Sequence, residues 1–160
     1  MILSTHAIVG GAFASLFPSH PIAVVAACFA SHFAIDAIPH WDYPLRSISV
    51  APGARNQLTL GEPLLRDLVL IGFDACSGLA LAVALFATPA TVLVIVLGAV
   101  AAMLPDPLQF VHTLYPQEPL KSLQCFHRWI HTKRQLGSLM GVSSQAAFVI
   151  VVIGVTTALN

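Results

Sequence analysis

The sequence predicts an all-α integral membrane protein with about five transmembrane helices and one short interfacial helix. Three observations predict this class. Of the 160 residues, 57% are hydrophobic and only 9% are charged, whereas a soluble domain carries roughly 25% charged residues. Apolar runs recur along the whole chain, and the mean hydropathy is +0.84. The polar residues gather in a few segments between those runs. We therefore expect a single transmembrane helical domain over 1–160.

Five apolar segments have close to the ~20 residues that crossing the hydrocarbon core requires. They cover about 2–17, 21–38, 63–87, 90–110 and 136–158. Prolines mark several boundaries: Pro21 and Pro63 lie near helix starts, and Pro39 follows a helix end. The spacing of Gly137 and Gly141 favours close helix packing, either within the chain or in a homodimer. Gly10-Gly11 is interpreted in the same way.

Two longer polar loops separate these spans, over about 39–62 and 111–135. The first is rich in Pro, Ser and Gly, which predicts an irregular path. In the second, apolar residues and one histidine recur at helical spacing: Leu120, Leu123, His127 and Ile130. This pattern predicts a short helix lying in the membrane interface, with Trp129 at the level of the head groups.

The basic residues indicate the orientation in the membrane. Five spans place the N-terminus and both long loops on one side, and every Lys and Arg lies in those loops or just inside an adjoining helix: Arg46, Arg55, Arg66, Lys121, Arg128, Lys133 and Arg134. The positive-inside rule then predicts a bacterial inner-membrane protein with a cytoplasmic N-terminus and its polar site facing the cytoplasm. The net charge of zero gives no indication of a nucleic-acid partner.

The end of the second span carries the densest group of potential metal ligands. His32, Asp36 and His40 are spaced i, i+4 and i+8, which stacks them along one helix face, and Asp42 follows just after Pro39. A divalent metal needs convergent nitrogen and oxygen ligands, and this spacing supplies them. The alternative is a helix end whose polar side chains simply face head groups. We expect the full set to bind a divalent metal, with Zn²⁺ as the first choice.

Further candidates lie in other helices. Asp74 is flanked by apolar residues about three turns into the third span, where an unpaired acid costs ~2.5–3.5 kcal/mol. It is therefore expected either to bind the metal or to make a structural hydrogen bond. Asp106 lies between two prolines and is either a site residue or part of a helix-stop turn. His127 and His131, at i and i+4, can hold one metal, or they belong to a basic interfacial helix. His6 is expected to join the site.

Several short motifs resemble those of the bacterial membrane-bound metal-dependent hydrolases. They are Thr5-His6, Leu104-Pro105-Asp106 and His127-Arg128-Trp129-Ile130-His131, and Pro39-His40-Trp41-Asp42 could take the second role instead. Asp106 is followed by Pro-Leu-Gln where the family has a second acid and a histidine, and the histidine pair is spaced by four instead of five. More distantly, the His/Asp pattern is similar to that of zinc-dependent phospholipase C enzymes, which implies phosphoester chemistry.

We thus expect a membrane-embedded metal-dependent hydrolase that acts on a lipid or lipid-linked phosphoester through a metal-activated water. The expected metal ligands are His6, His32, Asp36, His40, Asp74, His127 and His131. Asp42 or Asp106 would act as general base, and Arg66 or Arg128 would neutralise the phosphate. The alternatives are a non-enzymatic metal or proton carrier, and a scaffold whose polar cluster only ties helices together.

Overall fold

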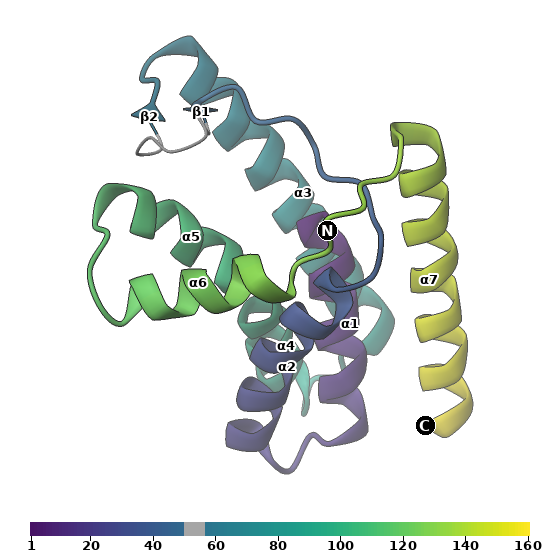
Figure 1. The fold of residues 1–160 in the computed structure, drawn as a ribbon. Coiled ribbons are helices and arrows are strands. Elements are labelled where there is room, and N and C mark those ends of the chain that lie inside the picture. Colours follow the sequence, from purple (N-terminus) through teal and green to yellow (C-terminus); the bar gives the residue numbers. More distant parts are fainter. Residues whose placement is uncertain (50–56) are drawn as a thin grey trace.

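The structure, a computed structural model, describes residues 1–49 and 57–160 and is predominantly α-helical (Figure 1). The helices of the described residues are α1 (Leu3–Leu16), α2 (Pro21–Asp36), α3 (Glu62–Phe86), α4 (Val92–Met103), α5 (Pro105–Leu114), α6 (Leu120–Ile130) and α7 (Ser138–Leu159). Two short strands, β1 (Ile48–Ser49) and β2 (Gln57–Leu58), pair antiparallel with Ile48 opposite Leu58. Of the predicted basic residues, Arg55 lies outside the described residues.

Helix α1 lies at the centre of the molecule and packs against α2, α3, α4 and α7. Small residues allow this close packing. A Cβ atom at position 10 would collide with the carbonyl oxygen of Gly98 on α4, so the two backbones approach more closely than a side chain permits. The prediction of close packing at Gly10 is confirmed. A Cβ at Gly141 would instead collide with Trp41, so this glycine accommodates the segment after α2 and not another helix.

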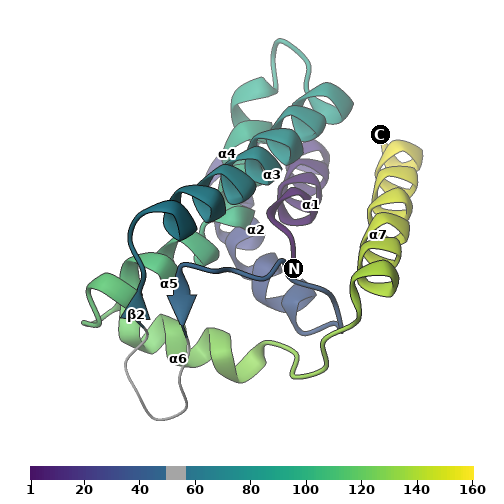
Figure 2. The ribbon, with the colours of Figure 1, turned by 90° about the horizontal axis from the view of Figure 1, so that it is seen from above.

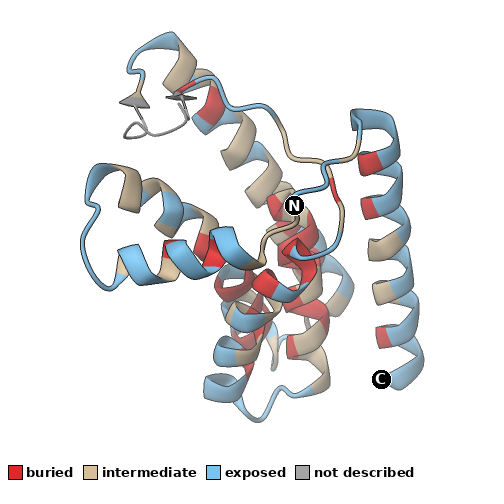
Figure 3. Cartoon of the chain, in the orientation of Figure 1, coloured by how far each residue is buried: buried red, intermediate tan, exposed pale blue. Residues whose placement is uncertain are grey.

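Apolar side chains form two core clusters around α1. The cluster between α1, α2 and α4 contains Ala14, Val24, Cys28, Val94, Ile95, Ala101 and Ala102. The cluster between α1, α3 and α4 contains Leu3, Ala7, Ala82, Ala99 and Met103. Figure 3 shows that burial is concentrated on these central helices, whereas α3 and α7 have few buried residues. The exposed faces of α3 and α7 are themselves apolar, with Phe73 and Leu139 among the most exposed residues. Faces of this kind are typical of helices surrounded by lipid.

Two helices, α3 and α7, are long and apolar enough to cross a membrane, and α4 with α5 makes a third if the pair forms one bent span. The span predicted over about 90–110 is divided into α4 and α5, and its second part continues to Leu114. The chain bends by 47° between α4 and α5, because Pro105 and Pro107 lack the N–H groups that would continue the helix. Helices α1 and α2 are apolar but have only 14 and 16 residues.

The short helix predicted in the second loop is present as α6, and its amphipathic pattern is confirmed. Its covered face includes Leu123, Gln124 and His127, while Trp129 is exposed. Helices α5 and α6 pack side by side, away from α7 (Figure 2). After α6 the chain runs back along the end of α2, where the N–H of Thr132 donates to the carbonyl oxygen of Asp36 at 2.9 Å. This main-chain contact brings the end of α6 to the end of α2.

Candidate metal centre

Histidine and aspartate side chains from four helices converge where α1, α2, α5 and α6 meet. At their centre is the carboxylate of Asp36, in the last turn of α2, which is 1% exposed. The sequence positions are far apart, but the fold brings these ligands together around Asp36: His6, His32, His40, Asp42, Asp106, His127 and His131.

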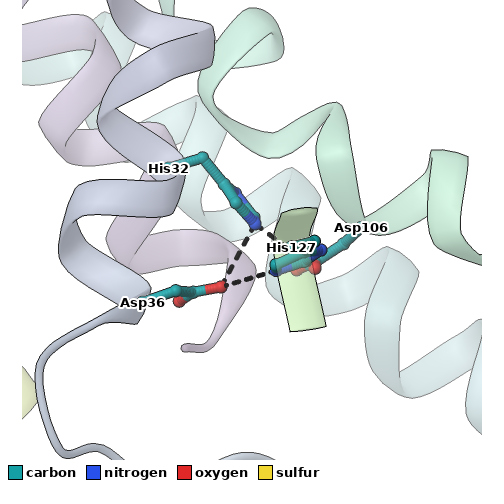
Figure 4. Close-up of side chains that lie close together, drawn as sticks. All are labelled: His32, Asp36, Asp106 and His127. Atoms are coloured by element: carbon teal, nitrogen blue, oxygen red, sulfur yellow. Dashed lines mark hydrogen bonds and ion pairs between the residues drawn. The ribbon is translucent and has the colours of Figure 1, made fainter. Parts of the chain in front are cut away.

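A first group consists of His32, Asp36, Asp106 and His127, each of which offers one ligand atom within 4.8 Å of the others (Figure 4). The Nε2 atoms of His32 and His127 each lie 3.2 Å from Oδ2 of Asp36. His32 Nε2 is also 3.5 Å from Oδ1 of Asp106. The ring of His6 stacks on that of His32 with centroids 4.0 Å apart, and its Nε2 lies 3.2 Å from Oδ1 of Asp36.

A second group shares the same carboxylate and consists of Asp36, His40 and His131. Their Nε2 atoms each lie 3.9 Å from an oxygen of Asp36. Asp42 adjoins this group, with Oδ2 at 3.2 Å from Nε2 of His40 and 3.7 Å from Nε2 of His131. The amino group of Met1 lies 2.8 Å from a carboxylate oxygen of both Asp36 and Asp42. The space between these ligands is therefore one that attracts positive charge.

Main-chain carbonyl groups set the tautomers of His32, His40 and His131. In each ring Nδ1 lies within hydrogen-bond distance of a carbonyl oxygen: 2.8 Å to Ala102, 2.7 Å to Ile38 and 3.0 Å to Thr132, respectively. A carbonyl oxygen can only accept, so Nδ1 is the donor in each case. In the neutral ring Nε2 then carries a lone pair, and in all three this atom faces the carboxylates. Metal-binding histidines are oriented by the same kind of contact.

The lone pairs of His32 and His131 face carboxylate oxygens, which are also electron-rich, whereas Nε2 of His40 also lies 2.8 Å from the Met1 amino group. Among the described residues, Nε2 of His32, both ring nitrogens of His6 and Nδ1 of His127 are buried without a hydrogen-bond partner. Each unsatisfied buried polar group costs roughly 1–3 kcal/mol. Protonation of all the rings would supply the missing protons but is electrostatically unfavourable, since two imidazolium ions 5 Å apart repel by about 3 kcal/mol at an effective dielectric constant of 20. A divalent cation between Asp36 and the Nε2 atoms that face it would satisfy both these nitrogens and the carboxylate, and the donor set fits one.

Asp42 lies outside the helices and faces both the cluster and a cavity. Burial alone would raise the pKa of Asp42, but the hydrogen bond with His40 and the charge of the Met1 amino group hold this pKa below its ordinary value. The carboxylate is therefore ionised at neutral pH. Its side chain is 29% exposed, and that of Asp106 is 32% exposed. Both acids can thus reach a molecule in the cavity as well as the cluster.

Two of the predicted site residues lie apart from both groups. Asp74, predicted as a metal ligand, accepts a hydrogen bond from the N–H of Ser4 at 3.1 Å and so caps the first turn of α1. Arg66 donates to its neighbour Asp67 at 3.2 Å. Arg128 is exposed and lines a cavity together with His127 and His131, which leaves it within reach of a molecule bound there.

Sequence reasoning missed Gln145, a buried residue of α7. Its Oε1 accepts from the N–H of Ile2 at 3.1 Å, and its Nε2 donates to the carbonyl oxygen of Trp41 at 2.9 Å. The amide therefore ties α7 to the start of the chain and to the segment that carries His40 and Asp42. A lone amide within an otherwise apolar span was the available signal, because such residues usually face other helices.

Comparisons of this chain with protein-family models, curated proteins and solved structures found no match. The resemblance to membrane-bound metal-dependent hydrolases stays a prediction from the motifs. Within the structure, the histidines and the acid that carry that resemblance, His6, Asp106, His127 and His131, all lie in the candidate metal centre.

Proposed function

We propose that this chain is a membrane-embedded metal-dependent hydrolase of a lipid or lipid-linked phosphoester, with Asp36 as the central ligand of one or two Zn²⁺ ions. The observation that carries the proposal is the convergence of five imidazoles on one buried carboxylate, with the Nε2 atoms of three of them fixed as lone-pair donors. Imidazole nitrogen and carboxylate oxygen are ligands that suit zinc.

The two groups around Asp36 suggest two metal positions. His32, Asp106 and His127, with His6 beside them, would hold the first ion. His40 and His131, with Asp42 beside them, would hold the second. Asp36 belongs to both groups, and each of its oxygens lies near histidines of both, so the two positions would share this residue.

The chemistry follows from the positions of the acids. A metal lowers the pKa of a bound water from ~15.7 towards ~7, which supplies a nucleophile at neutral pH. The water oxygen bonds to phosphorus as the ester P–O bond breaks. The water proton would pass to Asp42 or Asp106, whichever is not engaged as a ligand, and from that acid to the leaving alkoxide. Arg128, beside His127 and His131 in the adjoining cavity, would neutralise the phosphate charge.

We place the chain in a bacterial inner membrane as five spans, with the N-terminus and the metal centre at the cytoplasmic side. The exposed apolar faces of α3 and α7 support this arrangement. Helices α1 and α7 run in the same direction (Figure 1), as the first and fifth of five alternating spans must. Helices α1 and α2 are short for a span, so the bilayer would have to become thinner around them. Such thinning costs on the order of a fraction of a kcal/mol for each Å of mismatch between helix and bilayer.

The alternatives make different demands on the fold. A carrier needs polar groups along a path through the bundle, but the interior between α1, α2 and α4 is filled with apolar side chains such as Val24 and Ile95. A scaffold needs no metal at all. The polar cluster at one end of the bundle therefore favours a site over a path.

The proposal is tested with a water-soluble phosphodiester, methyl p-nitrophenyl phosphate, and the zinc-loaded protein in detergent. We expect zinc-dependent release of p-nitrophenol that falls at least about 100-fold in Asp36→Asn and His127→Ala. His20→Ala, which alters an exposed histidine remote from the cluster in the link between α1 and α2, is the matched control and should keep full activity. Circular dichroism checks that each variant is folded.

Zinc-loaded, folded protein that hydrolyses neither this diester nor p-nitrophenyl phosphate would contradict the proposal. Zinc uptake into sealed vesicles in that case would indicate a carrier instead.

A further inference from the structure

Two cavities of opposite character adjoin the metal centre. The larger has a volume of about 450 Å³, within the range of about 300–1,000 Å³ that is usual for small-molecule pockets. Asp42 and Asp106 contribute to its wall, so it reaches the metal centre directly. Most of the remaining wall is apolar and comes from α3, α5 and the segment after α2: Leu45, Leu64, Leu68, Ile71 and Phe110.

The smaller cavity has a volume of about 240 Å³ and is lined by polar and basic groups. Its wall contains His127 and His131 of the metal centre together with Arg128 and Lys133. Gln109 of α5 lines both cavities, so the two cavities are neighbours. Asp106 lies in the wall of the larger one and His127 in the wall of the smaller one. A molecule that fills both must therefore be apolar at one end and anionic at the other.

We propose that the larger cavity holds an alkyl chain of the substrate and that the smaller one holds its anionic head group, so that the scissile phosphoester lies between them at Asp106 and His127. This inference rests on the proposed function and specifies its substrate class: an amphiphile with a hydrocarbon chain directly attached to the reacting head group. It also separates two tasks, because the cavity that selects the chain is distinct from the one that binds the charge.

The charges favour this orientation over the reverse. The charged side chains that line the larger cavity are the carboxylates of Asp42, Asp67 and Asp106, which would repel an anionic head group. The Met1 amino group also lines it, but this cation is already paired with Asp36 and Asp42, at 2.8 Å from each. The smaller one presents Arg128 and Lys133. The larger cavity also reaches the surface at Leu68, which is 52% exposed on the apolar outer face of α3. A lipid chain would enter there from the bilayer, sideways, without crossing water.

A chain that leaves the bilayer for this cavity exchanges one apolar environment for another, so the transfer itself contributes little free energy. The cavity is therefore expected to position the phosphoester against the metal centre. Such positioning affects the rate of the chemical step strongly, because a displacement of about 1 Å can cost about 100-fold.

The test compares two diesters with the same leaving group, hexadecyl p-nitrophenyl phosphate and methyl p-nitrophenyl phosphate, at a fixed detergent concentration. Leu64→Trp and Leu68→Trp fill the larger cavity. Leu85→Trp changes an exposed leucine of the same helix that does not line it and serves as the control. We expect the two filling variants to lose at least about 10-fold of the hexadecyl activity while the methyl activity and zinc content stay at the wild-type level.

A binding measurement keeps this inference separable from the proposed function. Hexadecylphosphonate, which cannot be hydrolysed, should form a 1:1 adduct with the wild type in native mass spectrometry. The adduct should be lost in Leu64→Trp and Leu68→Trp and weakened at least about 10-fold in Arg128→Ala/Lys133→Ala, which removes both cations of the smaller cavity.

If neither diester is hydrolysed, the proposed function fails, but the adduct pattern still decides the position of the chain. Equal loss of both activities, unchanged hexadecyl activity, or an adduct that the tryptophan variants retain would overturn the inference.

Discussion

Helices α2 and α3 both carry a deeply buried aspartate, and the surroundings of the two carboxylates differ. Asp36 of α2 and Asp67 of α3 are each 1% exposed. Oδ2 of Asp67 accepts three hydrogen bonds from the segment before β1, at 2.7 Å from the N–H groups of Arg46 and Ser47 and 2.8 Å from the Ser47 hydroxyl. Asp36 instead faces imidazole nitrogens, several of which have their proton on the opposite side of the ring.

The difference shows that burial alone does not identify a functional acid. Asp67 is surrounded by hydrogen-bond donors, so its charge is satisfied and its role is to hold the segment at 46–47 against α3. Asp36 is paired with the Met1 amino group but is otherwise faced by imidazoles, and Nε2 of His32 and His131 carries a lone pair directed at carboxylate oxygens. These lone pairs are satisfied only by added protons or by a further cation. The orientation of the neighbouring imidazoles, set by carbonyl oxygens, therefore separates a structural carboxylate from a candidate metal ligand.

The largest expected effect that tests this comparison is on zinc affinity. Asp36→Asn removes the shared ligand and should weaken zinc binding by at least about 100-fold. Asp67→Asn, the matched change on α3, should leave the affinity unchanged. Competition with a chromophoric zinc chelator measures both. Equal affinities in the two variants would show that Asp36 does not hold the metal and would remove the distinction between the two acids.

A smaller effect, on stability, should have the opposite pattern. Asp67→Ala leaves three donors of the 46–47 segment without their acceptor, and hydrogen bonds to a charged group contribute about 1.5–3 kcal/mol each at most. We expect the free energy of unfolding to fall by roughly 2–3 kcal/mol, measured by denaturant titration in detergent. In metal-free protein, Asp36→Asn should leave stability nearly unchanged, because the amide keeps an oxygen acceptor for the Met1 amino group and adds N–H donors for the imidazole lone pairs. A metal-free Asp36→Asn protein less stable than Asp67→Ala would argue for a structural role of Asp36.

The smallest expected effect concerns Asp74, the other aspartate of α3. Its carboxylate caps the N-terminal turn of α1 through Ser4, an arrangement that contributes typically about 1 kcal/mol. Asp74→Asn keeps an acceptor and should cost less than about 1 kcal/mol in thermal unfolding, with zinc content unchanged. Loss of zinc in this variant would show that Asp74 is a metal ligand, as its position within an apolar segment predicted.

The sequence predicted the parts of the site that depend on local spacing. His32, Asp36 and His40 repeat every helical turn, and the amphipathic pattern of α6 identified the face that carries His127. The role of Asp74 could not be assigned in this way, because depth in an apolar segment shows that an acid needs a partner but not which one. The 47° bend after α4 followed from prolines whose effect was expected, while its size and the continuation to Leu114 depend on packing against α6.

The convergence of α2 and α6 was the least predictable feature. It depends on main-chain hydrogen bonds, from Thr132 to Asp36 and from Leu136 to His40, each at 2.9 Å. Backbone pairs of this kind leave no signature in residue type. Gln145 was overlooked for a related reason: its partners, the main-chain groups of Ile2 and Trp41, are distant in sequence and apolar in their side chains.

The measurement that tests the central claim most directly is the metal content of detergent-purified protein, by mass spectrometry, for the wild type, Asp36→Asn and His131→Ala. The account predicts stoichiometric zinc in the wild type, one ion fewer in His131→Ala if both positions are filled, and loss of zinc in Asp36→Asn with the fold retained. Well-folded wild-type protein that holds no metal, even after zinc is added back, would contradict the account and leave a scaffold as the better description.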